Sequence, residues 1–127
     1  MPPHLRATFP GTPVGVGTIR QRVADIAREC GLDERRVDDV RLATSEAASN
    51  AVVHAYRDGR EGEIRVSAEI VGEELVVVIA DDGPGMVPRT DSPGLGLGLP
   101  VITTVSDRME VVSENGGTEL HMAFRLA

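Results

Sequence analysis

The spacing of apolar side chains changes several times along the first half of the chain. Residues 5–9 favour a short edge strand, which the following Pro-Gly pair ends. From Thr12 to Gly31 apolar residues recur every three or four positions, which predicts a helix with Thr12 as its N-cap. A second, longer helix is predicted from Asp33, its N-cap, to about Tyr56. Its apolar face consists of Val37, Val40, Ala43, Ala47, Ala51 and Ala55.

The second half of the chain changes to the period of strands. Residues 63–70 alternate between apolar and polar side chains, as a strand with one solvated face does. Residues 75–80 are apolar without a break, which predicts a buried central strand. A short helix is expected at 99–106, because Pro100 is tolerated only near a helix start. Residues 109–113 and 119–126 predict a closing hairpin.

This order of elements defines the expected fold class. Strand, two helices, two strands, helix and two strands predict an α/β (α+β) two-layer sandwich. We expect a mixed, mostly antiparallel sheet with the helices on one face. The length of 127 residues fits one domain, residues 1–127.

Charge and composition exclude several classes of function. The net charge of -7 repels nucleic-acid phosphates, and there is no basic helix, so direct nucleic-acid binding is not expected. Every basic residue is Arg, and without a lysine the chain cannot contain a P-loop. No stretch approaches the roughly 20 apolar residues that span a membrane. With Cys30 as the only cysteine, a cytoplasmic location is expected.

Two polar residues stand out on the second predicted helix. Glu46 and Asn50 are four positions apart and therefore share one side of that helix. Taken alone they favour a solvated stripe on an amphipathic helix, since most helical Glu and Asn residues lie on one. However, the neighbours of Asn50 are small or apolar, and a buried amide without a partner would cost roughly 1–3 kcal/mol. Mg²⁺ would supply that partner, because it accepts a carboxamide oxygen and leaves other positions to phosphates and water.

An acidic, glycine-rich turn follows the central strand. Asp81 ends that strand, and its carboxylate can accept a hydrogen bond from the exocyclic amine of adenine. Gly83 and Gly85 leave room for a flat base near the backbone. An ordinary turn that closes a strand explains the same residues.

A second glycine-rich segment and a Gly-Thr pair complete the candidates. Gly94, Gly96 and Gly98 alternate with leucines, so the segment can fold over a ligand and present N–H groups to phosphates. A flexible linker is the alternative. Thr118 follows a glycine, which a hairpin entering its next strand also explains.

In sequence order, these pieces resemble the four conserved boxes of the GHKL ATPase superfamily. The resemblance covers nearly the whole chain and is greatest to the small anti-sigma-factor serine kinases of bacteria. It implies a Bergerat, or histidine kinase-like, ATPase fold that binds ATP and Mg²⁺. The residues that carry it are Glu46, Asn50, Asp81, Gly83, Gly85, Gly94, Gly96, Gly98 and Thr118.

The resemblance also implies a role for each residue. Glu46 would be the general base on a substrate hydroxyl, and Asn50 would ligate the Mg²⁺ that bridges the phosphates. Asp81 would hold adenine, with Thr118 close to that base. The other residues would line the adenine pocket (Gly83 and Gly85) or form a lid (Gly94, Gly96 and Gly98).

The implied partners are proteins. The resemblance predicts a homodimer that sequesters a sigma factor and phosphorylates a Ser or Thr of a STAS-type anti-sigma-factor antagonist. No membrane partner is expected.

One position departs from the pattern of these kinases, which often carry a basic residue just before the lid glycines. Here Asp91-Ser92-Pro93 precedes Gly94, and the nearest cation is Arg89. An ATP-binding regulatory module that controls a partner without phosphotransfer therefore stays open as a second hypothesis. The ATPase half of a histidine kinase and a set of coincidental turns are two further alternatives.

Overall fold

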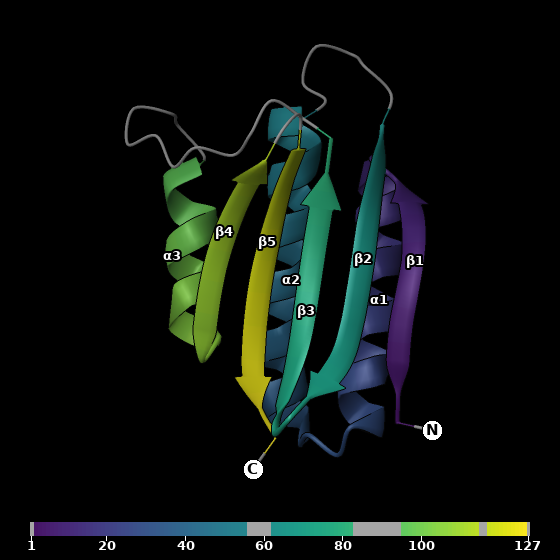
Figure 1. Ribbon diagram of the computed structural model, residues 1–127, viewed down its shortest axis with the longest axis vertical. Coiled ribbons are helices and arrows are strands. Elements are labelled where there is room, and N and C mark those ends of the chain that lie inside the picture. The colour runs from purple at the N-terminus through teal and green to yellow at the C-terminus, as the bar shows by residue number, and fades with distance from the viewer. Residues whose placement is uncertain (1, 56–61, 83–94, 115–116, 127) are drawn as a thin grey trace.

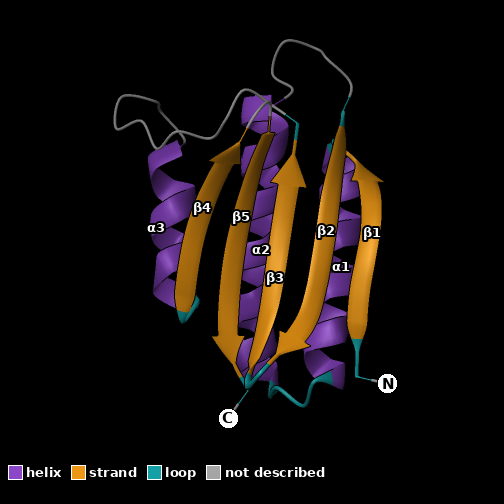
Figure 2. Ribbon diagram, viewed as in Figure 1, coloured by secondary structure: helices purple, strands orange, loops and turns teal. Residues whose placement is uncertain are grey.

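The computed structural model describes residues 2–55, 62–82, 95–114 and 117–126. Within them, five strands form one sheet, and three helices form a second layer over one of its faces (Figures 1 and 2). The elements in chain order are β1 (His4–Pro10), α1 (Pro13–Glu29), α2 (Glu34–Ala55), β2 (Glu63–Val71), β3 (Glu74–Asp81), α3 (Leu95–Val105), β4 (Arg108–Glu114) and β5 (Gly117–Arg125). The two-layer α/β arrangement predicted from the sequence is confirmed.

The strands lie in the order β1-β2-β3-β5-β4. All four pairings among the described strands are antiparallel, so the sheet is not mixed as the sequence suggested. The central strand, β3, lies between β2 and β5, and its alternate residues Leu75, Val77 and Ile79 are buried on the helix side. This confirms the sequence-based prediction of a buried central strand.

The helices lie side by side behind the sheet, with α2 between α1 and α3 (Figure 1). The core lies between the two layers. It includes the inward face of β5 and, from the predicted apolar face of α2, Val37, Val40, Ala43, Ala47 and Ala51. Fully buried side chains with large volume include Ile19, Val37, Leu75, Met122 and Phe124. No helix in the described part of the chain is long and apolar enough to cross a membrane.

Local capping explains where the first two helices begin and end. The Thr12 hydroxyl accepts a hydrogen bond from the Gly15 N–H at 3.1 Å, and Asp33 Oδ1 accepts one from the Arg36 N–H at 2.9 Å. Both N-caps were predicted. Gly31 has a φ of 91°, a left-handed conformation that ends the helical path after α1.

Cys30, the residue before Gly31, is partly buried, and burial raises the pKa of its thiol.

The third helix differs from the prediction. It begins at Leu95 rather than at residue 99, so Gly96 and Gly98 belong to its first turns and Pro100 lies inside it. An interior proline removes one helical hydrogen bond, which is why the sequence placed the helix start next to it. The helix continues past it nevertheless, and the hydroxyls of Thr103 and Thr104 donate to the Pro100 carbonyl.

Candidate functional site

Asn50, Asp81 and Thr118 lie near one end of the two layers. There β3 ends at Asp81, β5 begins, and the C-terminal end of α2 lies behind both strands (Figure 1). Asp81 and Thr118 are directly opposite each other in the β3–β5 pairing. Both side chains are buried, with 4% and 2% of their surfaces exposed. Because Asp81 follows Val77 and Ile79 in strand alternation, its carboxylate lies on the helix side of the sheet.

The glycine before Thr118 has a structural reason that the sequence did not reveal. A Cβ atom at Gly117 would lie 2.8 Å from the carbonyl oxygen of Asp81. A side chain at this position would therefore push the end of β3 away from β5. Only three-dimensional contact identifies Gly117, because its partner Asp81 is 36 positions earlier in the chain.

The acidic pair at the end of β3 is divided between the two faces of the sheet. Asp81 lies on the helix side, whereas Asp82 Oδ1 accepts a hydrogen bond from Arg65 Nη1 of β2 at 2.8 Å. Arg65 lies on the outer face, since its neighbour Ile64 is buried under the helices. Asp82 is thus engaged away from the site, whereas the carboxylate of Asp81 lies on the helix side.

Asn50 has the burial that the sequence predicted. Only 6% of its surface is exposed, and its Nδ2 atom has no hydrogen-bond partner among the described residues. Leaving a buried amide unpaired costs about 1–3 kcal/mol, and native structures leave few such groups. A ligand that offers oxygen atoms would satisfy this amide, so the observation supports a binding role.

Glu46 lies one helical turn before Asn50 and is half-buried. At about 100° per residue, Asp39, Glu46 and Asn50 fall within about 40° of one another around the α2 axis. This flank faces α3, because Arg36 binds both Asp39 (2.8 Å) and the Val105 carbonyl at the end of α3 (3.3 Å). The two candidate side chains therefore point toward the space between α2 and α3.

The other predicted residues divide into two groups. Gly83, Gly85 and Gly94 lie outside the described residues, as does Arg89. Gly96 and Gly98 are described and lie in the first turns of α3, whose N-terminus is at the same end of the molecule as the C-terminal end of α2 (Figure 1). Their proposed contact with phosphates stays a prediction.

The chemistry of this end fits a nucleotide with a bound cation. Asp81 offers acceptor oxygens on the sheet, Asn50 offers an unpaired amide on α2, and Glu46 offers a carboxylate one turn away. Within the described ranges, no three His, Cys, Asp or Glu side chains form a metal site by themselves. The unpaired Nδ2 atom is a donor, so it suits a phosphate or water oxygen, and a cation would bind through the other amide atom of Asn50, Oδ1. Such a cation would take its remaining ligands from the nucleotide and water, as Mg²⁺ commonly does.

Curated relatives resemble the chain along most of its length. It is 31% identical to the serine-protein kinase RsbW of Bacillus velezensis, over 91% of this chain and 81% of the relative. It is 39% identical to the anti-sigma F factor of Clostridium kluyveri, over 72% of this chain and 70% of the relative.

Solved structures share the fold. The RsbU and RsbW domains of Rv1364c from Mycobacterium tuberculosis match with a TM-score of 0.76 and 26% identity. That match covers 97% of this chain but only 32% of the larger protein. A blue-light activated histidine kinase of Erythrobacter litoralis, 17% identical with a TM-score of 0.63, shows the fold alone.

The model of one protein family, the histidine kinase-like ATPase domain, matches residues 9–124. The match includes Glu46, Asn50, Asp81 and Thr118, the four described side chains of the candidate site. This chain therefore belongs to the histidine kinase-like ATPase domain family.

Proposed function

We propose that this protein is an ATP-dependent protein serine/threonine kinase that acts as an anti-sigma factor and phosphorylates an anti-sigma-factor antagonist in a bacterial partner-switching system. Membership of an ATPase domain family implies that the nucleotide is ATP. The names of the relatives, serine-protein kinase and anti-sigma F factor, support the protein substrate and the sigma-factor partner. A STAS-type antagonist and a cytoplasmic location, where sigma factors act, are part of the same proposal.

The observation that carries this proposal is the flank of α2 on which Glu46 and Asn50 lie. Asn50 is buried with an unpaired amide, and Glu46 is half-buried one turn away. A phosphate-binding group and a potential general base are thus adjacent, as phosphoryl transfer to a hydroxyl requires. Asp81, on the neighbouring strand end, would accept the hydrogen bond from the adenine amine.

The chemical step follows from these positions. Asn50 would hold the Mg²⁺ that neutralises charge on the phosphates, and the main-chain groups of the glycine-rich segments would hold the phosphates themselves. Glu46 would accept the proton of the substrate hydroxyl while that oxygen bonds to the γ-phosphorus. The bond between the γ-phosphorus and the bridging oxygen would break, and ADP would leave with the electron pair.

Phosphate transfer tests this proposal. The protein, Mg²⁺ and γ-labelled ATP would be added to a lysate of the source cell, and the protein that gains label would be purified and its modified residue identified. We expect a phosphoserine or phosphothreonine. Glu46→Gln should slow transfer to the purified acceptor by about 10²–10⁴ while Mg-ATP still binds.

The same experiment separates the alternative function. A regulatory module without phosphotransfer would bind Mg-ATP and change its affinity for a partner, yet no protein would gain phosphate. Transfer that is as fast with Glu46→Gln as with the unchanged protein would show that another group is the base.

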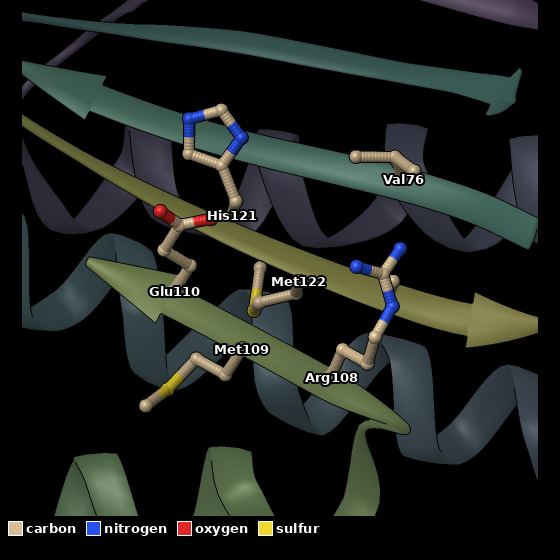
Figure 3. Close-up of a pocket in the computed structure, with 7 residues that line it drawn as sticks. Val76, Arg108, Met109, Glu110, His121 and Met122 are labelled. Carbon is tan, nitrogen blue, oxygen red and sulfur yellow. The ribbon is translucent and has the colours of Figure 1, made fainter. Parts of the chain in front are cut away.

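A homodimer is also part of the proposal, and the outer face of the sheet supports it. No described helix covers this face (Figure 1), and its centre contains Val76, Val78, Ala80 and Ala123. Two shallow depressions of about 470 and 530 Å³ lie on it. Figure 3 shows the first, where His121 and Glu110 project beside each other from β5 and β4.

Charges surround this apolar centre in a self-complementary arrangement. Arg6 and Arg65 lie toward the β1 edge, whereas Glu110 and Glu119 lie toward the β4 edge. A two-fold axis through the centre would place the arginines of one copy near the glutamates of the other. Two arginines of this face already have partners on their own chain. Arg65 hydrogen bonds to Asp82, and Arg108 hydrogen bonds to Glu74 and thereby lowers the pKa of that carboxyl.

Sedimentation equilibrium tests the dimer. The protein should sediment as a dimer at micromolar concentration, and Val76→Arg, on the outer face, should convert it to a folded monomer. A monomeric wild-type protein at about 100 µM would contradict the dimer without affecting the proposed kinase activity.

A further inference from the structure

The exposed side of α2 changes character along its length. Residues 34–41 include six charged side chains, whereas residues 42–53 include only one, Glu46. The second stretch still reaches the surface, because Leu42 is 44% and Val53 is 54% exposed. These two residues are among the four large hydrophobic side chains that the described part of the chain exposes. Single exposed apolar residues are common on protein surfaces, but here two of them flank a stretch of the helix whose only charged residue is Glu46.

Helical geometry places the exposed residues of the second stretch of α2 on one ridge. Leu42, Ser49 and Val53 fall within about 40° around the helix axis, with Glu46 on the α3 side of the same arc. The ridge is about 16 Å long at 1.5 Å per residue. Between its apolar ends lie Ser45 and Ser49, which are small and half-buried. The small residues allow another polypeptide to approach the helix closely.

Five of the six charged side chains of the first stretch pair with other groups of the chain. Arg41 pairs with Asp38 at 2.7 Å, and Arg36 pairs with both Asp39 and Asp107 at 2.8 Å. Protein interfaces are depleted of charge at their cores and enriched in apolar contacts. The ridge of residues 42–53 shares this low charge, whereas the self-paired stretch before it does not.

We propose that this ridge, formed by Leu42, Ser45, Ser49 and Val53, is the docking surface for the protein that accepts the phosphate. The inference rests on the proposed function. The acceptor hydroxyl must come within about 2.6–3.2 Å of the base, and Glu46 lies at the margin of the ridge. A protein that brings its hydroxyl to Glu46 therefore covers the helical turns on either side, where Leu42 and Val53 are exposed.

The partner surface follows from the same chemistry. The acceptor presents its Ser or Thr on a segment flanked by apolar side chains and without an adjacent cluster of acidic residues, which Glu46 would repel. Apolar contacts at the two ends of the ridge hold the segment, and the serines between them let its backbone approach α2.

Charge reversal on the ridge tests the inference. Leu42→Glu and Val53→Glu introduce an unpaired charge into the proposed interface. Val71→Glu is the matched control, because Val71 is the same residue type as Val53, is also 54% exposed, and ends β2 at the opposite end of the sheet (Figure 1). Transfer to the acceptor purified from the lysate experiment would be measured with each variant.

We expect both ridge variants to raise the KM for the acceptor at least about tenfold, with kcat at saturating acceptor and the Kd for Mg-ATP unchanged. The control should match the unchanged protein. Leu42→Ser and Val53→Ser, which add no charge, should raise KM by less and guard against an effect on folding.

Three outcomes would overturn the inference. Ridge variants that match Val71→Glu in KM would exclude this surface while leaving the kinase proposal intact. Loss of sigma-factor binding or of self-association with unchanged transfer would assign the ridge to another partner. Absence of any transfer by the unchanged protein would remove the proposed function first.

Discussion

The two halves of α2 share one helix but have different tasks. In residues 34–41, five of the six charged side chains pair with other groups of the chain, namely Glu34, Arg36, Asp38, Asp39 and Arg41. In residues 42–55 the described polar groups include two buried atoms without a hydrogen-bond partner, Thr44 Oγ1 and Asn50 Nδ2. The first half is satisfied internally, and the second half leaves polar groups available.

Arg36 shows how the first half contributes to the fold. Its guanidinium bonds to Asp39 on the same helix, to Asp107 at 2.8 Å and to the Val105 carbonyl, and it lies 5.8 Å from the centre of the Phe124 ring. Asp107 in turn accepts from the Arg125 N–H at 2.7 Å. This end of the molecule therefore connects α2, α3 and β5. The opposite end carries the candidate nucleotide site.

The largest effect is expected at Asn50. Asn50→Leu removes the proposed Mg²⁺ ligand, so the affinity for Mg-ATP should fall about a hundredfold, or roughly 2.7 kcal/mol. The unfolding midpoint in denaturant should not fall, because the unpaired buried amide is removed as well. Calorimetric titration and urea unfolding measure the two quantities. If Asn50→Leu unfolds more easily and still binds ATP normally, Asn50 serves the fold rather than the nucleotide site.

Arg36→Ala should produce the opposite pattern. It removes a half-buried charge-assisted network, and the free energy of unfolding should fall by about 2 kcal/mol. The affinity for Mg-ATP should not change. Arg41→Ala is the matched control, since the partner of Arg41 among the described residues, Asp38, is largely exposed and the loss of this pair should cost less than about 1 kcal/mol. Equal losses of unfolding free energy for the two variants would show that the Arg36 network stabilises the fold no more than an exposed ion pair does.

Gly117→Ala tests whether strand contact positions the carboxylate of Asp81. The added methyl group would displace the Asp81 carbonyl, so Mg-ATP should bind about tenfold more weakly, or roughly 1.4 kcal/mol. Gly17→Ala is a suitable control, because a Cβ there meets no atom within 4 Å. An unchanged affinity in Gly117→Ala would show that β3 adjusts without moving the site.

Thr44→Val should have the smallest effect and sharpens the contrast between the two unpaired groups. Thr44 is fully buried, and its hydroxyl has no partner within the described chain. Replacing it with an apolar group of the same shape should raise the free energy of unfolding by about 1 kcal/mol and leave ATP affinity unchanged. Urea unfolding measures the first quantity. A loss of ATP affinity would mean that Thr44 also serves the site.

Local patterns in the sequence predicted most of the fold. The order of the eight elements and both helix caps followed from periodicity and from Thr12 and Asp33, because these signals act over a few residues. The start of α3 was wrong because Pro100 normally marks a first turn. The mixed sheet was wrong because strand pairing is a long-range property that periodicity does not encode.

The candidate site was predictable to a similar extent. The burial of Asn50 followed from its small and apolar neighbours, and the sequence placed Asp81 at the end of the central strand, but the face of the sheet on which its carboxylate lies came from the structure. Thr44 was missed and the structural reason for Gly117 was not foreseen, because an unpaired hydroxyl and a close backbone contact exist only after distant segments meet. The remaining glycines, Gly83, Gly85 and Gly94, stay predictions.

Titration of the folded wild-type protein with ATP is the most direct test of the central claim, that this end of α2 holds a magnesium-bound nucleotide. With millimolar Mg²⁺ we expect one ATP per chain and an increase in the thermal midpoint. Addition of EDTA should remove most of both signals, because Asn50 reaches the phosphates through the cation. No heat and no thermal shift at millimolar Mg-ATP, or equal binding in EDTA, would contradict the account.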